Sequence, residues 1–159
     1  MKRIVALAAI LAFAAAPLPV AEAKPRGCFT KQEQTAEEVV RYGLRLREGG
    51  QGCDEAPWLD RTRPLWDAVD SQFGPQFRQQ TETRRQAFIR EFENDAENKL
   101  SQWNARIVIY YRHYPLSQVY CDQLKKTLTD VTKKPWGAFV KQAAIAHNDV
   151  RMTYTPCDQ

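Results

Sequence analysis

Residues 104–115 read NARIVIYYRHYP, and whether this apolar and aromatic run forms a strand or a helix decides the fold class. Isoleucine, valine and tyrosine are common in strands, so the run taken alone is compatible with one. Its apolar residues, however, continue a series that recurs every three or four residues, which is the spacing of one helix face. From Phe77 onward that series includes Phe88, Phe92, Ala96, Leu100, Trp103, Ile107 and Tyr111. The spacing predicts a helix that Pro115 ends.

The predicted helix extends back to about Pro75, which makes it the longest element of the chain. The polar stretch ENDAEN, residues 93–98, interrupts its apolar series. A helix can bend or break where few apolar residues hold it against a core. We therefore expect either one long central helix or two consecutive helices that meet near this stretch.

Another helix is predicted over residues 30–48. Thr30 followed by Glu33 has the spacing of a capping box, and the glycine pair at residues 49–50 marks the expected end. Apolar residues between these limits recur at helical spacing, which indicates an amphipathic helix.

Prolines and caps predict the remaining helices. A short one begins at Pro64 and ends at Gly74 and Pro75, a further one is capped by Ser117, and the last begins around Pro135. No segment has the alternation of a sheet strand. The sequence therefore predicts an all-α fold, a four- or five-helix bundle with one long central helix, continuous or broken.

The first 23 residues, MKRIVALAAILAFAAAPLPVAEA, have the pattern of a secretory signal peptide. Lys2 and Arg3 precede an apolar stretch, and Ala21-Glu22-Ala23 forms a cleavage motif. The apolar stretch is shorter than the roughly 20 residues that span a bilayer, and no later segment is long and apolar enough to do so. We expect residues 1–23 to be removed, residues 24–159 to form a single helical domain, and the protein to be periplasmic or secreted.

The net charge of the chain does not indicate a nucleic-acid-binding protein. Lys and Arg number 23 and Asp and Glu 19, for a net charge of +4 that cleavage of the signal peptide would lower to about +3. A small excess without a concentrated basic patch gives at most a mild preference for anionic partners.

Four cysteines follow the predicted cleavage point, and we expect them to form two disulfides. An even number of cysteines in an exported chain is typical of disulfides, and the wide spacing here does not suit a metal site with four cysteine ligands. The reach of the first helix favours bridges that join the first half of the chain to the second, while an antiparallel hairpin of the last two helices favours a bridge within the second half. The cysteines are Cys28, Cys53, Cys121 and Cys157.

Motifs for catalysis and cofactors are few. The serines after the signal peptide do not occur in a G-x-S-x-G motif, and oxidised cysteines are poor nucleophiles. His113 and His147 are the only histidines, and neither has the spacing of a metal or haem site. We therefore expect no cofactor and no metal, and a metal or haem carrier is the least favoured function.

Carboxylates are numerous, so a hydrolase that uses a pair of them remains an alternative. Such an enzyme needs two carboxylates facing each other across a cleft, one of them in an apolar setting. Most of the acidic residues stand beside basic ones at helix positions that we expect to be exposed. Glu37 and Arg41, four residues apart, are predicted to pair on the exposed side of the first helix.

The end of the long helix combines tyrosine, arginine and histidine, and the first two of these are common in protein interfaces. We expect its outer face to be a partner surface, and the protein to be an exported, non-enzymatic binding protein such as an inhibitor, adaptor or chaperone-like module. The partner would be another envelope protein or an anionic envelope component. The candidate residues are Arg106, Tyr110, Tyr111, Arg112, His113 and Tyr114.

Overall fold

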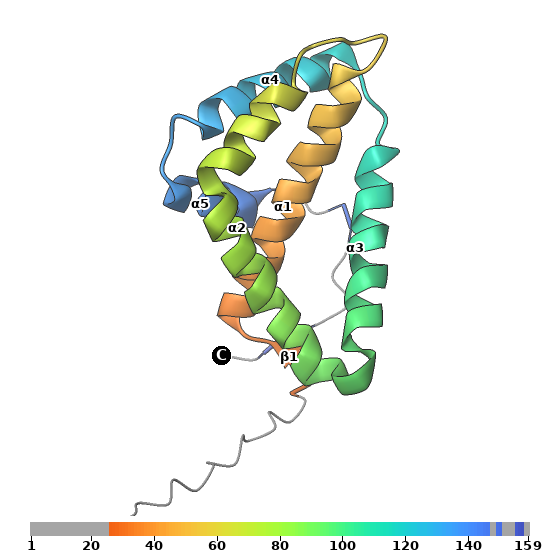
Figure 1. Cartoon of the computed structure of the whole chain (residues 1–159), viewed down its shortest axis with the longest axis vertical. Coiled ribbons are helices and arrows are strands. Elements are labelled where there is room, and N and C mark those ends of the chain that lie inside the picture. Colours follow the sequence, from red (N-terminus) through yellow and green to blue (C-terminus); the bar gives the residue numbers. More distant parts are fainter. Residues whose placement is uncertain (1–25, 147–148, 151–154, 158–159) are drawn as a thin grey trace, which may run out of the picture.

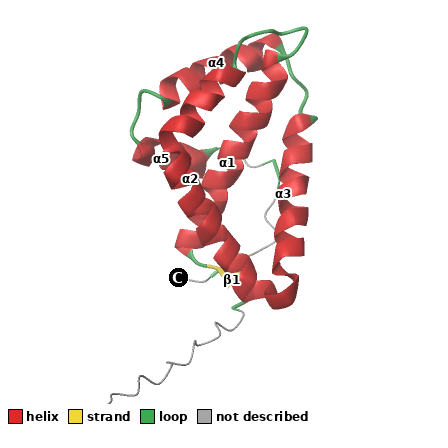
Figure 2. Cartoon of the chain, in the orientation of Figure 1, coloured by secondary structure: helices red, strands yellow, loops and turns green. Residues whose placement is uncertain are grey.

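The structure, a computed structural model, describes residues 26–146, 149–150 and 155–157. Five α-helices form this part of the chain: α1 (Lys31–Asp54), α2 (Arg63–Phe92), α3 (Ala96–Arg112), α4 (Gln118–Val131) and α5 (Trp136–Ile145). A 3-10 turn, Glu93–Asp95, links α2 to α3, and two short strands, β1 (Cys28–Phe29) and β2 (Thr155–Pro156), pair in parallel. The prediction of an all-α bundle is confirmed (Figure 2). The predicted signal peptide lies outside the described residues.

The first three helices run up, down and up along the long axis of the molecule (Figure 1). Helix α4 crosses the ends of α1 and α2, and α5 packs behind these two helices. Helix α1 is central, since it contacts each of the other four helices. Helix α3 packs on α1 and α2.

The apolar core is divided into two clusters along α1. The larger cluster joins α1 to the first half of α2, to α4 and to α5, and the smaller one joins α1 and β1 to the second half of α2 and to α3. Leu46, Val69, Phe73, Leu128 and Phe139 belong to the larger cluster, and Phe29, Phe88, Leu100, Trp103, Ile107 and Tyr111 to the smaller.

Of the two arrangements expected for the long helix, the structure has the second, two consecutive helices that meet near residues 93–98. Helix α2 ends at Phe92, and Glu93 adopts a backbone conformation with a positive φ of 46° before the 3-10 turn leads into α3. Helix α3 ends at Arg112, so the stretch at residues 104–115 is helical from residue 104 to residue 112.

The predicted end of the first helix, at the glycine pair 49–50, is wrong. Helix α1 continues through Gly49 and Gly50 to Asp54. A Cβ atom at Gly49 would lie 2.7 Å from the Tyr120 hydroxyl and 3.0 Å from Leu124, both on α4. The glycine therefore allows α4 to approach α1 closely, and it does not act as a stop signal.

The prediction that Gly74 and Pro75 separate two helices is also wrong, because α2 is continuous across them. Proline inside a helix removes a hydrogen bond and costs about 3 kcal/mol. Phe73 and Phe77 lie on either side of Pro75, and both pack against the rings of α5. This aromatic packing holds the two halves of α2 in line and offsets the local cost.

Both disulfides join the first half of the chain to the second, as we favoured. One links Cys28 to Cys157, which ties β1 to the segment after β2, and the other links Cys53 near the end of α1 to Cys121 in α4. No helix in the described part of the chain combines the length and the apolar character that crossing a membrane requires.

Candidate functional site

The helical period of α3 decides which of its side chains reach the surface. Leu100, Trp103, Ile107 and Tyr111 are buried against α1 and α2. Ile109 and Tyr110 therefore point outward, and 56% and 38% of their surfaces are exposed.

The tyrosines of this stretch form a continuous row of rings. The ring centres of Tyr110 and Tyr111 are 5.2 Å apart, those of Tyr110 and Tyr114 are 6.0 Å apart, and Tyr114 lies 5.4 Å from Tyr120 of α4. The row runs from the buried face of α3 across its outer face to α4.

The structure separates the six predicted surface residues into two groups. Tyr111 is buried, with 4% exposed, so its side chain belongs to the core. The other five are accessible, and together with Ile109 they make up what we call the tyrosine surface: Arg106, Ile109, Tyr110, Arg112, His113 and Tyr114. The guanidinium of Arg106 lies over the ring of Trp103, 5.5 Å from its centre.

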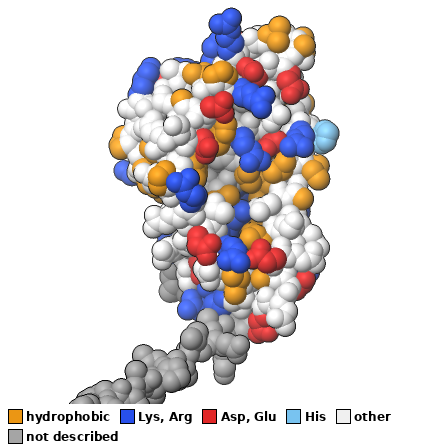
Figure 3. Space-filling view, viewed as in Figure 1, with side chains coloured by type: hydrophobic (Ala, Val, Ile, Leu, Met, Phe, Trp, Pro, Cys, Tyr) orange, Lys and Arg blue, Asp and Glu red, His pale blue; other side chains and the backbone are white. Residues whose placement is uncertain are grey.

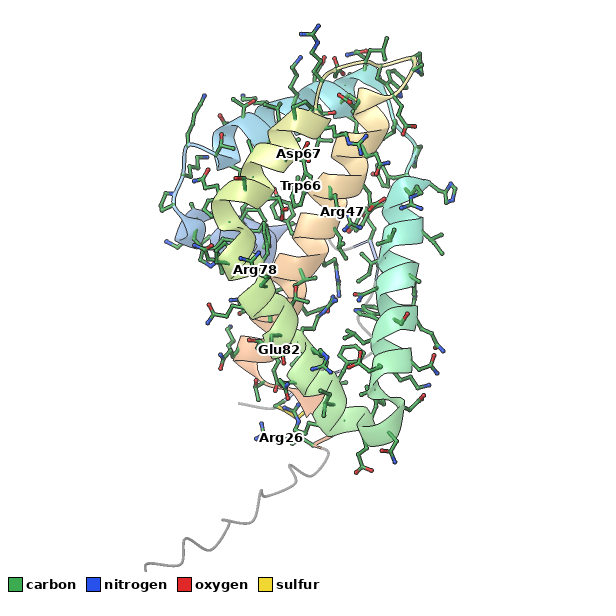
Figure 4. The ribbon with its side chains drawn as sticks, viewed as in Figure 1. Arg26, Arg47, Trp66, Asp67, Arg78 and Glu82 are labelled. Atoms are coloured by element: carbon green, nitrogen blue, oxygen red, sulfur yellow. A yellow bond between two sulfur atoms is a disulfide. The ribbon has the colours of Figure 1, made fainter. Side chains whose placement is uncertain are left out.

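A buried carboxylate fixes the tyrosine surface to α1. Glu48, only 4% exposed, accepts a hydrogen bond from Arg47 Nη2 at 2.6 Å on one oxygen and from Arg112 Nε at 3.2 Å on the other. Arg47 lies on the side of α1 that faces α3 (Figure 4). The end of α3 is therefore held in a defined position.

Nearer the start of α1 lies a second buried carboxylate, that of Glu37. Its pairing with Arg41 was predicted, but its burial was not. Glu37 and Arg41 are 0% and 2% exposed, so the expectation of an exposed pair is wrong. One oxygen of Glu37 accepts from Arg41 Nη2 at 2.7 Å and from Trp103 Nε1 at 2.9 Å. The other accepts from Arg84 Nη1 at 3.2 Å.

The burial of this pair has a geometric reason. At about 100° per residue, Glu33, Glu37 and Glu48 lie within about 60° of one another around α1. Each meets an arginine of α2 or α3, namely Arg90, Arg84 and Arg112. Basic and acidic side chains also lie close together on the molecular surface seen in Figure 3. The charged residues thus join α1 to the α2–α3 hairpin.

Glu37 and Glu91 use their carboxylate oxygens in contacts that hold the fold, whereas burial raises the pKa of the neighbouring Glu38. Glu37 is fully buried and its oxygens are engaged by three side chains, and Glu91 accepts from the backbone N–H groups of Arg26 and Gly27. Among the described residues, no three His, Cys, Asp or Glu side chains come close enough to hold a metal ion.

On the far side of α1, a pocket of about 300 Å³ opens between α1, α4 and α5. Its polar lining residues are Tyr42, Arg45, Tyr120, Gln123, Thr127 and Gln142, and its apolar ones are Leu46, Leu124, Ile145 and Ala146. Tyr120 belongs both to this lining and to the row of rings, so the pocket adjoins the tyrosine surface.

The tyrosine hydroxyls of the pocket are donors at neutral pH. Burial raises the pKa of Tyr42 to about 12, although the charge of Arg45 opposes the shift. Burial also raises the pKa of Tyr120, and the charge of Asp149 adds to that rise while a hydrogen bond with Arg45 opposes it.

Sequence reasoning missed the pocket because its residues come from three helices that are far apart in the chain. One signal was present in α1: Tyr42, Arg45, Leu46 and Gly49 share one face of the helix, and a glycine beside polar and aromatic side chains can mark a close contact.

No protein-family model, curated protein or solved structure matches the chain.

Proposed function

We propose that this protein is exported to the periplasm or secreted, and that it binds another envelope protein through the tyrosine surface. The observation that carries the proposal is the exposed group of Ile109, Tyr110 and Tyr114, held rigidly on α3 and bordered by basic side chains. Tyrosine and arginine supply much of the binding energy in protein interfaces.

Charge narrows the choice of partner. Arg106, Arg112 and His113 lie on the same end of α3 as the aromatic rings. Two carboxylates lie near them: Glu48, which is buried and already paired with two arginines, and Asp149, whose charge adds to the effect of burial in raising the pKa of Tyr110. An acidic protein segment carrying an apolar or aromatic side chain complements such a surface. The occupant that we propose is therefore an acidic segment of a second envelope protein.

Export is supported by two features. The first 23 residues have the pattern of a cleavable signal, and the two disulfides are typical of an oxidising compartment. Mass spectrometry of protein recovered from the native host should find Lys24 as the first residue, and a chain that still begins at Met1 would contradict export by cleavage.

The hydrolase alternative has less support. None of the ten described residues that line the pocket is acidic, and the buried carboxylates act as acceptors between helices. A non-enzymatic role is the function that these contacts favour.

Site-specific photocrosslinking tests the proposed surface. A benzophenone amino acid in place of Tyr110 should give one defined adduct in the native host, whereas the same group in place of Gln79, which is exposed on α2, should not. Adding Arg106→Glu should abolish the adduct, and adding Arg78→Glu, an equal charge change at an exposed site on α2, should leave it intact. An adduct that survives Arg106→Glu, or that forms equally from position 79, would overturn the proposal.

A further inference from the structure

The positive charge of the chain is concentrated on α4, α5 and the turn between them. Residues 118–146 hold five lysines and two aspartates, an excess of three positive charges. Residues 24–117 and 147–159 together hold 16 basic and 16 acidic residues, so the rest of the predicted mature chain is neutral. An excess confined to one region gives that region a positive electrostatic field.

The basic residues of these two regions also differ in kind. All five in residues 118–146 are lysines, whereas 13 of the 16 elsewhere are arginines. Within the described residues, the ion pairs use six of those arginines and Lys99, and no lysine of residues 118–146 takes part in one. The arginines therefore join helices to one another, while these lysines add charge to the surface.

Helix α5 presents an outer face that is small, apolar and basic. Phe139 and Ala143 are buried against the bundle. Ile145 is 84% exposed, the highest value among the large apolar side chains of the described part, and a Cβ at Gly137 would meet nothing within 4 Å. At about 100° per residue, the exposed residues opposite the buried side are Gly137, Lys141, Ala144 and Ile145.

Two further lysines lie at the start of α5, in the exposed turn that follows α4. Together with the outer face of α5 they form what we call the lysine surface: Lys133, Lys134, Gly137, Lys141, Ala144 and Ile145. The carboxylates nearest to it in sequence are Asp130, in the last turn of α4, and Asp149. The charge of Asp149 contributes to raising the pKa of Tyr110 and of Tyr120, which places this carboxylate toward the row of tyrosine rings.

The composition of the lysine surface favours a membrane over a protein as its partner. Lysine and alanine are depleted in protein interfaces, where tyrosine and arginine are enriched. At an anionic membrane, each lysine near the surface strengthens binding about fivefold. An exposed apolar side chain beside the lysines can enter the boundary between headgroups and acyl chains.

We propose that the lysine surface binds the anionic phospholipid headgroups of a membrane. The three ammonium groups would lie against phosphates, and Ile145 would enter the interface. Binding of this kind is weak and reversible, because lasting attachment needs stronger signals. In the view of Figure 1, α5 and α3 lie on opposite sides of α1. A molecule attached through α5 would therefore keep the tyrosine surface accessible, and neither surface depends on the other.

Vesicle flotation tests the proposal. Residues 24–159, which include every helix and strand of the described part, would be used with both disulfides intact, because the apolar residues 1–23 would bind vesicles by themselves. The protein should float with vesicles that contain phosphatidylglycerol and phosphatidylcholine in equal amounts, and not with phosphatidylcholine alone. Raising the sodium chloride concentration from about 0.05 to about 0.5 M should abolish binding.

Two double variants test the contribution of charge. Lys134→Gln with Lys141→Gln should weaken binding to the anionic vesicles about 25-fold, as expected for two lysines at a membrane surface. Arg78→Gln with Lys99→Gln removes the same charge from exposed sites on α2 and α3, and it should leave binding unchanged.

A second pair of variants tests the apolar contribution. Ile145→Ser should weaken binding about fivefold, because part of the apolar surface of the side chain would no longer be removed from water. Val119→Ser makes a similar change on α4, at a site that is 67% exposed and lies outside the lysine surface, and it should have no effect.

Several outcomes would overturn the proposal. These are equal binding to both kinds of vesicle, equal effects of the two double variants, or equal effects of Ile145→Ser and Val119→Ser. Binding to soluble polyglutamate but not to vesicles would assign the lysines to an acidic protein instead. Release from vesicles by sodium phosphate, but not by sodium chloride of equal ionic strength, would indicate a site for a single phosphate. Photocrosslinking from position 110 does not depend on these results, so the two proposals fail separately.

Discussion

At the scale of single residues, Glu37 is the position where a conservative change should matter most. Glu37→Gln keeps the shape of the side chain but removes its charge, which leaves Arg41 and Arg84 buried without a counter-ion. Removing one member of a buried ion pair costs about 3–5 kcal/mol. We expect a loss of unfolding free energy of this size in urea denaturation followed by circular dichroism.

The control for this change is Glu82→Gln. Glu82 pairs with Arg85 on the surface of α2, where solvent screens the interaction, so the denaturation midpoint should stay where it is. If Glu37→Gln were as mild as Glu82→Gln, the buried network would not hold α1 against α2 and α3.

This residue also shows what a single sequence can and cannot reveal. The spacing of Glu37 and Arg41 predicts their pairing, because a separation of four residues is a local property of a helix. Their burial depends on Arg84 and Trp103, which are 47 and 66 residues away from Glu37. No local pattern in α1 identifies those partners.

At the scale of elements, a contact between two helices explains why α1 runs beyond its predicted end. Gly49→Ala should raise the intrinsic helix propensity of α1, yet its Cβ would collide with Tyr120 and crowd Leu124. Overpacking of this kind costs about 1–3 kcal/mol. Because Tyr120 is held by a hydrogen bond with Arg45 and by the ring of Tyr114, we place the cost in the upper part of that range, above the propensity gain of about 1 kcal/mol. We expect Gly49→Ala to lower the urea midpoint and to shift the NMR signals of Tyr120.

Gly137 in α5 supplies the matched control, since a Cβ there would meet nothing within 4 Å. Gly137→Ala should therefore stabilise the protein by up to about 1 kcal/mol. Stabilisation by both changes would show that α4 does not need the close approach at Gly49.

Helix boundaries were predictable where residues close in sequence determine them. The predictions were wrong where a contact with a distant helix determines the boundary. Ser117 caps α4 as expected, and its hydroxyl accepts from the backbone N–H of Tyr120. The polar stretch at residues 93–98 marks the break before α3 for the same local reason. Glycine and proline at 49–50 and 74–75 were misleading, because packing from α4 and α5 overrides their local preference. The candidate pocket was unpredictable for the same reason as these boundaries.

For the whole molecule, the two disulfides close loops of very different length. We expect their contributions to stability to differ mainly because of the packing around each bridge. The bridges span 129 and 68 residues, for which loop entropy predicts stabilisation of about 5 and 4 kcal/mol. Because this difference is small, packing around each bridge should decide. Cys53 and Cys121 are 0% exposed in the larger core cluster, whereas Cys28 and Cys157 are half-buried near the two ends of the described part of the chain.

Replacing each pair by alanine separates the two contributions. Cys53→Ala with Cys121→Ala removes a cross-link and also leaves a void where α1 meets α4, so it should lower the melting temperature further than Cys28→Ala with Cys157→Ala. Thermal unfolding under non-reducing conditions, followed by circular dichroism, measures both. The opposite order would mean that holding β1 against β2 stabilises the molecule more than the joint between α1 and α4. The smaller core cluster, which contains Phe29 of β1, would then be the part of the fold whose opening limits its stability.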